Sequence, residues 1–332
     1  MTLQLTVTPS QAEQAAPGNQ TQYLRKCALT VVNAKEALDL SALRIKFNTY
    51  QSDVQTPNSA VIRIFNLNDT TAKRVQQEFQ KVTLSAGYQN GPFGVIFAGT
   101  IKQVRRGRVD PTDTYLDILA ADGDEGYNFG VIQKALAPGW KPDDVLEEGR
   151  KAINADKGYT ANMTVAAASR GKVMYGMARD YLRTLTRSQG MVWSVQDGKL
   201  QLVPLTSYVP GRVVALNGQS GMIGLPEQTE GGITVKCLIN PAIRIGSAIQ
   251  INDASIQRAF LGGNYLYAQG RLEQLPGFNS LLPKISNDGL YRVYVAEFSG
   301  DTRGHEWYED IVCLAIDKSA PAGQQVQKAA TQ

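Results

Sequence analysis

The sequence predicts a mainly β-structured protein in which a small α/β insert separates two β-rich segments. Residues 43–47 and 82–86 alternate apolar and polar side chains, and a period of two places one face of a strand in a core. Strand patterns return in the last third of the chain, and the 31 glycines fit many tight turns. A chain of 332 residues is too long for one ordinary core, so we expect two or three domains.

Residues 1–123 are predicted to form the first β-domain. A strand at 95–104 follows a Gly-Pro-Phe-Gly break. One short helix, at about residues 70–79, interrupts the strands, and Asn68 or Asp69 can cap its first turn. Antiparallel strands at this spacing are typical of a small barrel or sandwich.

Residues 124–205 are predicted to form the α/β insert. Pro142 opens one helix that runs to about Asn154, because proline and the acids after it suit a first turn. A second helix is predicted over 172–187, with an apolar stripe that we expect to face a core. The stripe consists of Val173, Met177, Tyr181 and Leu185.

A hairpin closes the insert. Two alternating runs, 191–195 and 199–203, flank an Asp-Gly pair at Asp197 and Gly198. Asp-Gly between such runs is a strong signal for a two-residue hairpin turn.

Residues 206–318 are predicted to form the second β-domain, and residues 319–332 a flexible tail with almost no large apolar side chain. A short echo links the two β-domains. Residues 115–119 read Tyr-Leu-Asp-Ile-Leu and residues 308–312 read Tyr-Glu-Asp-Ile-Val, which indicates two related β-domains flanking the insert. The strands predicted in the second domain are 233–238, 247–251, 291–298 and 307–316.

The composition excludes several classes of protein. Three distant cysteines without a CxxC pair argue against a disulfide framework and a zinc site, and buried thiols in a reducing compartment are expected. No run of eighteen apolar residues could span a membrane, and no secretion signal begins the chain. The net charge is +4, and the densest basic cluster is Arg105, Arg106 and Arg108. We interpret it as a solvated strand end or turn, with an interface or a pore lining as the alternative.

The chain offers no recognisable catalytic, cofactor or metal site. Its one histidine, His305, lies in a predicted hairpin loop, and no nucleophile motif or phosphate loop is present. Asp122, Asp124 and Glu125 resemble the start of a calcium loop, but no glutamate follows at its twelfth position.

A group of carboxylates near the C-terminus is the one place where hydrolytic chemistry could reside, because two carboxylates can drive glycoside hydrolysis. Adjacent residues of a strand point in opposite directions, which separates Glu309 from Asp310, and no raised-pKa acid is evident. We therefore expect a solvated sheet edge. The group consists of Asp301, Glu306, Glu309 and Asp310.

Three segments in order resemble the baseplate hub proteins of contractile-tailed bacteriophages, the late-control-protein-D-like group. The first is 97–101 followed by 113–123, the second is 235–241 with Gly246 and Ile249, and the third is 291–308. The resemblance covers about residues 25–317.

The resemblance implies a fold, a location and partners. Members of this group carry two tube-like β-barrel domains with α/β material beside them, and three chains form a ring. The ring joins the sixfold tail tube protein to the threefold spike protein and lets viral DNA pass. The chain would then be a structural virion protein of the tail baseplate, assembled in the host cytoplasm, without cofactor or membrane insertion. The tape measure protein and the baseplate wedge are further expected partners.

Two other classes remain open at this point. A carbohydrate-binding or wall-degrading virion protein would need exposed aromatic residues on one face, whereas Trp140, Trp193 and Trp307 are scattered along the chain. A tail tube or tube-terminator protein is usually shorter, and the insert would have no explanation.

Overall fold

The computed structural model describes residues 22–163, 166–211, 213–229, 232–252, 256 and 289–316. Strands dominate these residues and helices are few, so the predicted mainly β class is confirmed. The tail expected at 319–332 lies outside the described residues.

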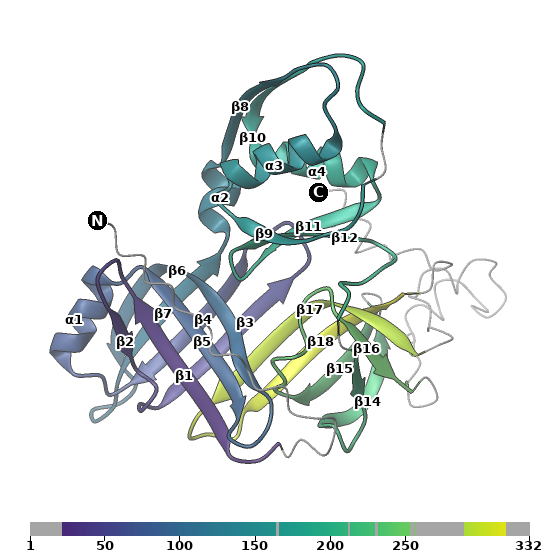
Figure 1. Ribbon diagram of the computed structural model, residues 1–332. Coiled ribbons are helices and arrows are strands. Elements are labelled where there is room, and N and C mark those ends of the chain that lie inside the picture. The colour runs from purple at the N-terminus through teal and green to yellow at the C-terminus, as the bar shows by residue number, and fades with distance from the viewer. Residues whose placement is uncertain are drawn as a thin grey trace, which may run out of the picture.

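A large sheet contains most of the strands (Figure 1). Its first group is β1 (Arg25–Val32), β2 (Ala37–Asp39), β3 (Ile45–Ser52), β4 (Asn58–Phe65), β5 (Lys81–Tyr88), β6 (Phe93–Arg108) and β7 (Thr114–Asp122). Its second group is β13 (Val214–Leu216), β14 (Met222–Thr229), β15 (Gly232–Leu238), β16 (Ala248–Ile251), β17 (Leu290–Asp301) and β18 (Trp307–Ala315).

The insert stands to one side of this sheet (Figure 1). Its strands are β8 (Val131–Leu136), β9 (Asp156–Thr160), β10 (Lys172–Met177), β11 (Met191–Gln196) and β12 (Lys199–Pro204), and its helices are α2 (Asp124–Phe129), α3 (Pro142–Ala152) and α4 (Ala178–Ser188). Strands β9, β11 and β12 form one small sheet and β8 pairs with β10 in another. A separate buried cluster around Trp193, Leu182 and Met174 forms the insert's core.

The large sheet repeats one strand order twice. Its path runs β14-β15-β18-β17-β3-β4-β7-β6 before continuing to β5, β1 and β2. The first four strands and the next four therefore follow the same order. Each set begins with two strands in chain order, β14-β15 or β3-β4. A hairpin follows whose two strands stand in the reverse of chain order, β18-β17 or β7-β6. We call these sets the β14–β17 unit and the β3–β6 unit.

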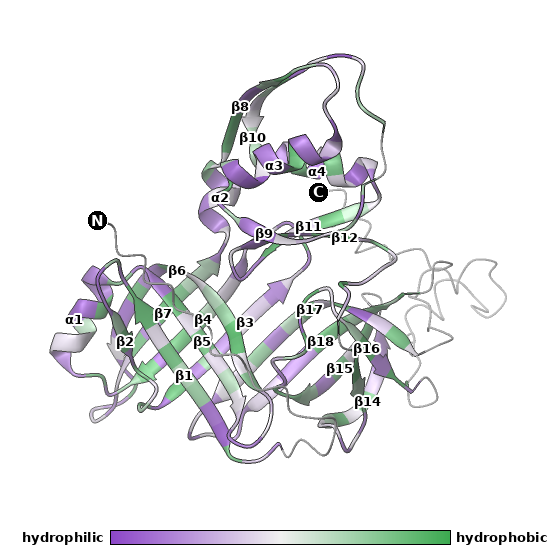
Figure 2. Ribbon diagram, viewed as in Figure 1, coloured by the Kyte–Doolittle hydropathy of each residue, from purple (hydrophilic) through white to green (hydrophobic). Residues whose placement is uncertain are grey.

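The two units meet along a seam where β17 pairs with β3. The antiparallel register runs from Val295 opposite Ser52 to Asp301 opposite Lys46. Beneath the seam, the indole of Trp307 packs edge-on against Phe47, with 5.6 Å between ring centroids. One buried apolar cluster draws residues from both units, so the seam lies over a core that the two units share. Figure 2 shows the hydrophobic and hydrophilic residues alternating along these strands.

The helix predicted over 172–187 is wrong in its first turns. Residues 172–177 form strand β10, and the helix begins only at Ala178. Val173, which we assigned to the apolar stripe, is 79% exposed. Gly176 has a φ of +146°, a conformation that breaks a helix at that point.

Other local predictions are confirmed. Helix α1 (Asp69–Glu78) has Asn68 as its N-cap, whose side chain accepts the Thr71 N–H. Asp197 and Gly198 both have positive φ, as a type I′ hairpin turn requires. Strand β6 is longer than predicted, because it continues beyond 104 to Arg108.

Candidate functional site

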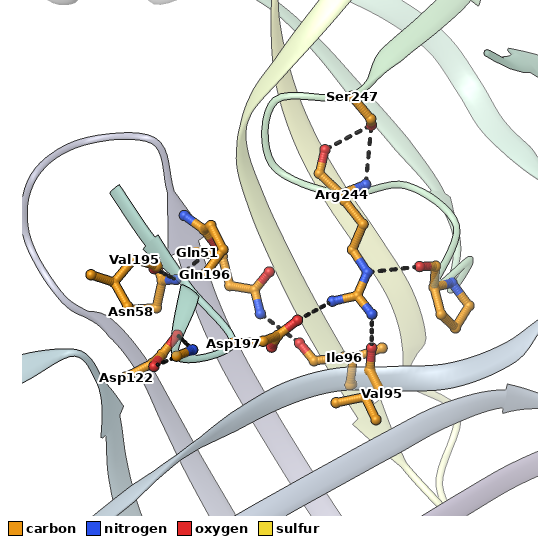
Figure 3. A network of polar contacts seen from close by, with 12 residues as sticks. Gln51, Asn58, Val95, Ile96, Asp122, Val195, Gln196, Asp197, Arg244 and Ser247 are labelled. Atoms are coloured by element: carbon orange, nitrogen blue, oxygen red, sulfur yellow. Dashed lines mark hydrogen bonds and ion pairs between the residues drawn. The ribbon is translucent and has the colours of Figure 1, made fainter. Parts of the chain in front are cut away.

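The hairpin turn of the insert is held by the β3–β6 unit (Figure 3). The Asn58 amide donates to the Val195 carbonyl at 3.1 Å and to Gln196 Oε1 at 2.9 Å. In return, Gln196 Nε2 donates to the Ser52 carbonyl at 2.7 Å. These groups are buried, so each bond also avoids the cost of an unpaired polar atom.

Arg244 ties the same turn to the rest of the large sheet. Its guanidinium donates to the Asp197 carboxylate at 2.7 Å, to the Val95 carbonyl at 2.6 Å and to the Pro241 carbonyl at 3.1 Å. Val95 belongs to β6 and Arg244 to the loop between β15 and β16. A single side chain therefore links the insert and both units (Figure 3).

A buried ion pair forms a second link. Arg292 of β17 is 2% exposed and pairs with Asp53, which follows β3. The same guanidinium donates to the Pro204 carbonyl at the end of β12, at 2.7 Å. Both links join the insert to strands of the two units.

Asp122 closes the junction at the end of β7. Its carboxylate accepts the Gly198 N–H at 3.0 Å. Burial raises the pKa of Asp122 to about 7, and the nearby negative charge of Asp197 adds to this rise. The residue that resembled a calcium-loop ligand therefore holds a turn. Within the described residues no group of histidines, cysteines and acids could hold a metal ion.

We predict that Asp122→Asn removes a pH-dependent cost of folding. Asp122 stays protonated in the folded chain up to about pH 7, whereas the unfolded chain ionises it near pH 4. Stability from this group is therefore lost as pH rises from about 4 to 7. Asparagine carries no charge and its oxygen can accept the same N–H, so the variant should be more stable than wild type at pH 8 by about 1–4 kcal/mol.

Urea unfolding at pH 5 and pH 8 measures this difference. The matched control is Asp110→Asn, because Asp110 is exposed and the N–H groups of Asp113 and Thr112 lower its pKa. If wild type and Asp122→Asn lose the same stability between pH 5 and 8, ionisation of the Asp122 carboxyl does not destabilise the folded chain.

The carboxylate group near the C-terminus does not form a solvated edge, which corrects the expectation from sequence. Glu309 is fully buried and Asp301 is 5% exposed. Glu309 Oε2 accepts the Asn240 N–H at 3.1 Å, and burial raises the pKa of this acid well above its usual value. Because Glu309 points into the core, a substrate could not reach it. A raised-pKa acid is thus present, in a structural position.

The other carboxylates of that group are paired. Asp301 accepts two bonds from Arg44, at 2.7 and 3.2 Å, and this partner lowers its pKa. Glu306 pairs with Lys46 at 2.9 Å. His305 lies exposed in the turn between β17 and β18, as expected. All three cysteines are free, and burial raises the pKa of Cys27 to about 12, so that thiol is not an activated nucleophile.

A cleft of about 720 Å³ lies between β5–β6 and the insert's α2, α3 and hairpin turn. Three of its carboxylates are engaged, since Asp124 pairs with Lys102 at 2.8 Å, Asp197 pairs with Arg244 at 2.7 Å and Asp122 accepts the Gly198 N–H.

The same ion pair recurs in both units. In the β3–β6 unit, Arg63 bonds Asp117 at 2.7 Å and lies over the Tyr115 ring at 4.2 Å. In the β14–β17 unit, Lys236 bonds Asp310 at 3.3 Å and lies over the Tyr308 ring at 4.9 Å. The Tyr-x-Asp echo in the sequence therefore marks equivalent strands, β7 and β18, with equivalent contacts.

These pairs lie on one polar face of the sheet. The strand registers place Arg105, Asp117, Arg63, Lys46 and Asp301 in one row across β6, β7, β4, β3 and β17. Charges of opposite sign are neighbours along much of the row, so the face is polar without a strong field of one sign.

The basic cluster of β6 does not form one patch. Arg105 lies on the polar face and approaches Asp117 at 3.6 Å. Arg106 projects to the other side of the strand and pairs with Asp69 of α1. Arg108 is exposed at the end of the strand. Among the described residues, no helix is long and apolar enough to cross a membrane.

Comparison with known proteins places the chain in a family. The baseplate hub gp41 family matches residues 25–269. A search of curated proteins finds no match. The fold is similar to the 43 kDa tail protein of prophage MuSo2 from Shewanella oneidensis, with 8% identity, a TM-score of 0.55 and coverage of 90% of this chain and 99% of that one. It is also similar to a tail protein from Neisseria meningitidis MC58, with 8% identity, a TM-score of 0.55 and coverage of 88% and 96%. From the family match, the chain belongs to the baseplate hub gp41 family and is a structural component of a bacteriophage tail.

Proposed function

We propose that this chain is the hub of a contractile tail, a trimeric adaptor that joins the sixfold tube to the threefold spike. The observation that carries the proposal is the repeated strand order within one sheet. Three chains with two equivalent units each offer six similar units, which a sixfold tube can meet on one side. The same ring keeps threefold symmetry for a spike on the other side.

A chain with two equivalent units divides into three domains. Residues 1–123 and 206–318 are the two tube-like domains, and 124–205 is the insert. The repeated cation–Asp–Tyr contacts of Arg63 and Lys236 support an equivalence between the domains. The insert contacts the end of the seam through Gln196 and Pro204 and projects beyond the large sheet (Figure 1), so we place it outside the ring, where it can contact wedge proteins.

The seam within the chain suggests how neighbouring chains join. Strand β17 pairs with β16 through residues 290–292 and with β3 through 295–301. Strand β6, its equivalent, pairs with β5 through 93–100, and the Ile101 N–H donates to the Gln80 carbonyl. Residues 102–108 have no strand partner on that side in the described sheet. The outer edge of β14, the equivalent of β3, is likewise unpaired in the described sheet.

We place β6 of one chain beside β14 of the next. Three such junctions and three internal seams would close a ring of six units. Arg105 would then lie at the junction on the polar face, and β14 contributes the exposed Glu227 to that face. The polar face would line the lumen, where neighbouring charges of both signs let DNA pass without strong attraction. We further propose that the chain has no catalytic role.

The test is assembly with purified tube and spike proteins, measured by mass. We expect a complex containing three copies of this chain, and we expect the double variant Arg105→Glu, Arg108→Glu to lower the trimer fraction at least about tenfold through like-charge repulsion. Lys199→Glu, an exposed charge reversal in the insert, is the matched control and should assemble normally. A monomer that binds both partners would contradict the adaptor.

A further inference from the structure

The β8–β10 ribbon lies at the end of the insert farthest from the large sheet (Figure 1). One face of it carries no charge, because its cross-strand pairs are Ala135–Val173, Gln133–Tyr175 and Val131–Met177. Val173 is 79% exposed, Tyr175 74% and Val131 53%. Figure 2 shows hydrophobic residues along both strands. Large apolar side chains gathered in this way on a surface mark an interaction site.

The edges of the ribbon differ from each other. The Tyr175 N–H donates to the Tyr181 hydroxyl at 2.9 Å, and that hydroxyl donates to the Tyr175 carbonyl at 3.4 Å. Both backbone groups of Tyr175 therefore point away from β8. The free edge of β10 is capped at its centre by a side chain of α4, which discourages another strand from pairing there.

The edge of β8 is open. Tyr175 and Gln133 are opposite each other and form a non-hydrogen-bonded pair. The backbone N–H and C=O groups of Gln133 therefore point away from β10. By the alternation of an antiparallel ladder, the N–H and C=O groups of Val131 and Ala135 share this direction. Within the described part of the chain, no residue bonds to the backbone of these three positions on that side.

Unpaired cations surround the ribbon. Lys134 and Arg170 are exposed, and Lys172 and Arg179 rest on the faces of Trp140 and Tyr127. None of these four cations forms an ion pair with a carboxylate of the described residues. Two copies of this ribbon paired edge to edge through β8 would bring these cations together, so a second copy is disfavoured as the third strand. Carboxylates on a partner would be attracted instead.

We propose that the free edge of β8 binds an extended segment of another protein, in which apolar and acidic residues alternate. The segment adds a third strand through the backbone of Val131, Gln133 and Ala135. Its apolar side chains would continue the uncharged face beside Val131 and Ala135. Its carboxylates, on the opposite face, would meet Lys134. We take the partner to be a tail protein because of the proposed hub function. The open edge of β8 and the cations near it do not depend on that function.

The test uses the full-length chain and a fluorescein-labelled peptide in which valine alternates with glutamate. We expect binding by fluorescence anisotropy. Gln133→Pro removes only an N–H that points to the free edge and leaves the β10 ladder intact, so affinity should fall at least about tenfold. Lys134→Glu should weaken binding several-fold, and Lys199→Glu, with the same charge change elsewhere in the insert, should not.

Three results would overturn the inference. They are no binding of the acidic peptide, equal binding of a peptide in which valine alternates with lysine, and unchanged affinity of a correctly folded Gln133→Pro chain. If that variant fails to fold, a peptide N-methylated on its pairing edge takes its place and must lose affinity for wild type. Binding of the wild-type chain to anionic vesicles that survives Gln133→Pro, without peptide binding, would identify a lipid surface instead. Gln133→Pro should still form the trimer, so a failure here is distinguishable from a failure of the hub proposal.

Discussion

Arg292→Met should destabilise the folded chain by about 3–5 kcal/mol, because it leaves the buried Asp53 carboxylate without its partner. Arg292 is 2% exposed, and it also satisfies the Pro204 carbonyl where the insert returns to the sheet. Methionine keeps much of the side-chain volume, so the loss reports on charge and hydrogen bonding and less on packing. Urea unfolding at constant pH measures the change.

Two variants make that result interpretable. Lys236→Met breaks an ion pair whose side chains are 45% and 38% exposed, and such a pair contributes about 0–1 kcal/mol. The double variant Arg292→Met, Asp53→Asn should recover part of the lost stability, because the unpaired charge is then gone. A loss below about 1 kcal/mol in Arg292→Met would show that this pair does not couple the insert to the two units.

Trp307→Ala should cost about 3–5 kcal/mol, the range for truncating a large buried aromatic residue. Trp307 is 1% exposed and packs edge-on against Phe47 beneath the seam. The cavity would therefore open between the β14–β17 and β3–β6 units, and the backbone of the β3–β17 pair would lose support. Amide hydrogen exchange should then rise along β3 and β17 more than in the insert.

Trp140→Ala is the matched control for this prediction. Trp140 belongs to the insert and is only partly buried, packing at the edge of the insert's core. We expect a smaller loss of stability and faster exchange confined to the insert. Faster exchange in the insert but not at the seam after Trp307→Ala would contradict the role assigned to Trp307.

The helix cap and the hairpin turn could be predicted from sequence, because each depends on residues that are close together in the chain. The Asn68 cap and the Asp197-Gly198 turn depend on residues within one turn of the chain. The Tyr-x-Asp echo indicated the equivalence of β7 and β18, which the structure shows in their matching contacts to Arg63 and Lys236. The three-residue pattern was enough to identify the equivalent strands, because one cation contacts both the tyrosine ring and the aspartate and so fixes their spacing along the strand.

Features that depend on distant residues could not be predicted. Val173 and Met177 fit a helical stripe equally well, and only the pairing of β10 with β8 shows that they lie on a strand face. Glu309 occupies the inward position that Leu116 holds in the equivalent strand, and a glutamate there gives no sign of burial. The seam pairs residues such as Thr49 and Phe298, whose distance in sequence conceals their contact.

The central claim is that two equivalent units per chain build one ring from three chains. A structure of the assembled hub, determined by electron microscopy on complexes with tube and spike proteins, tests it most directly. We predict threefold symmetry, six four-stranded units around the lumen, and β6 of each chain beside β14 of its neighbour. A ring with another number of chains, or one in which β6 and β14 both face solvent, would contradict it.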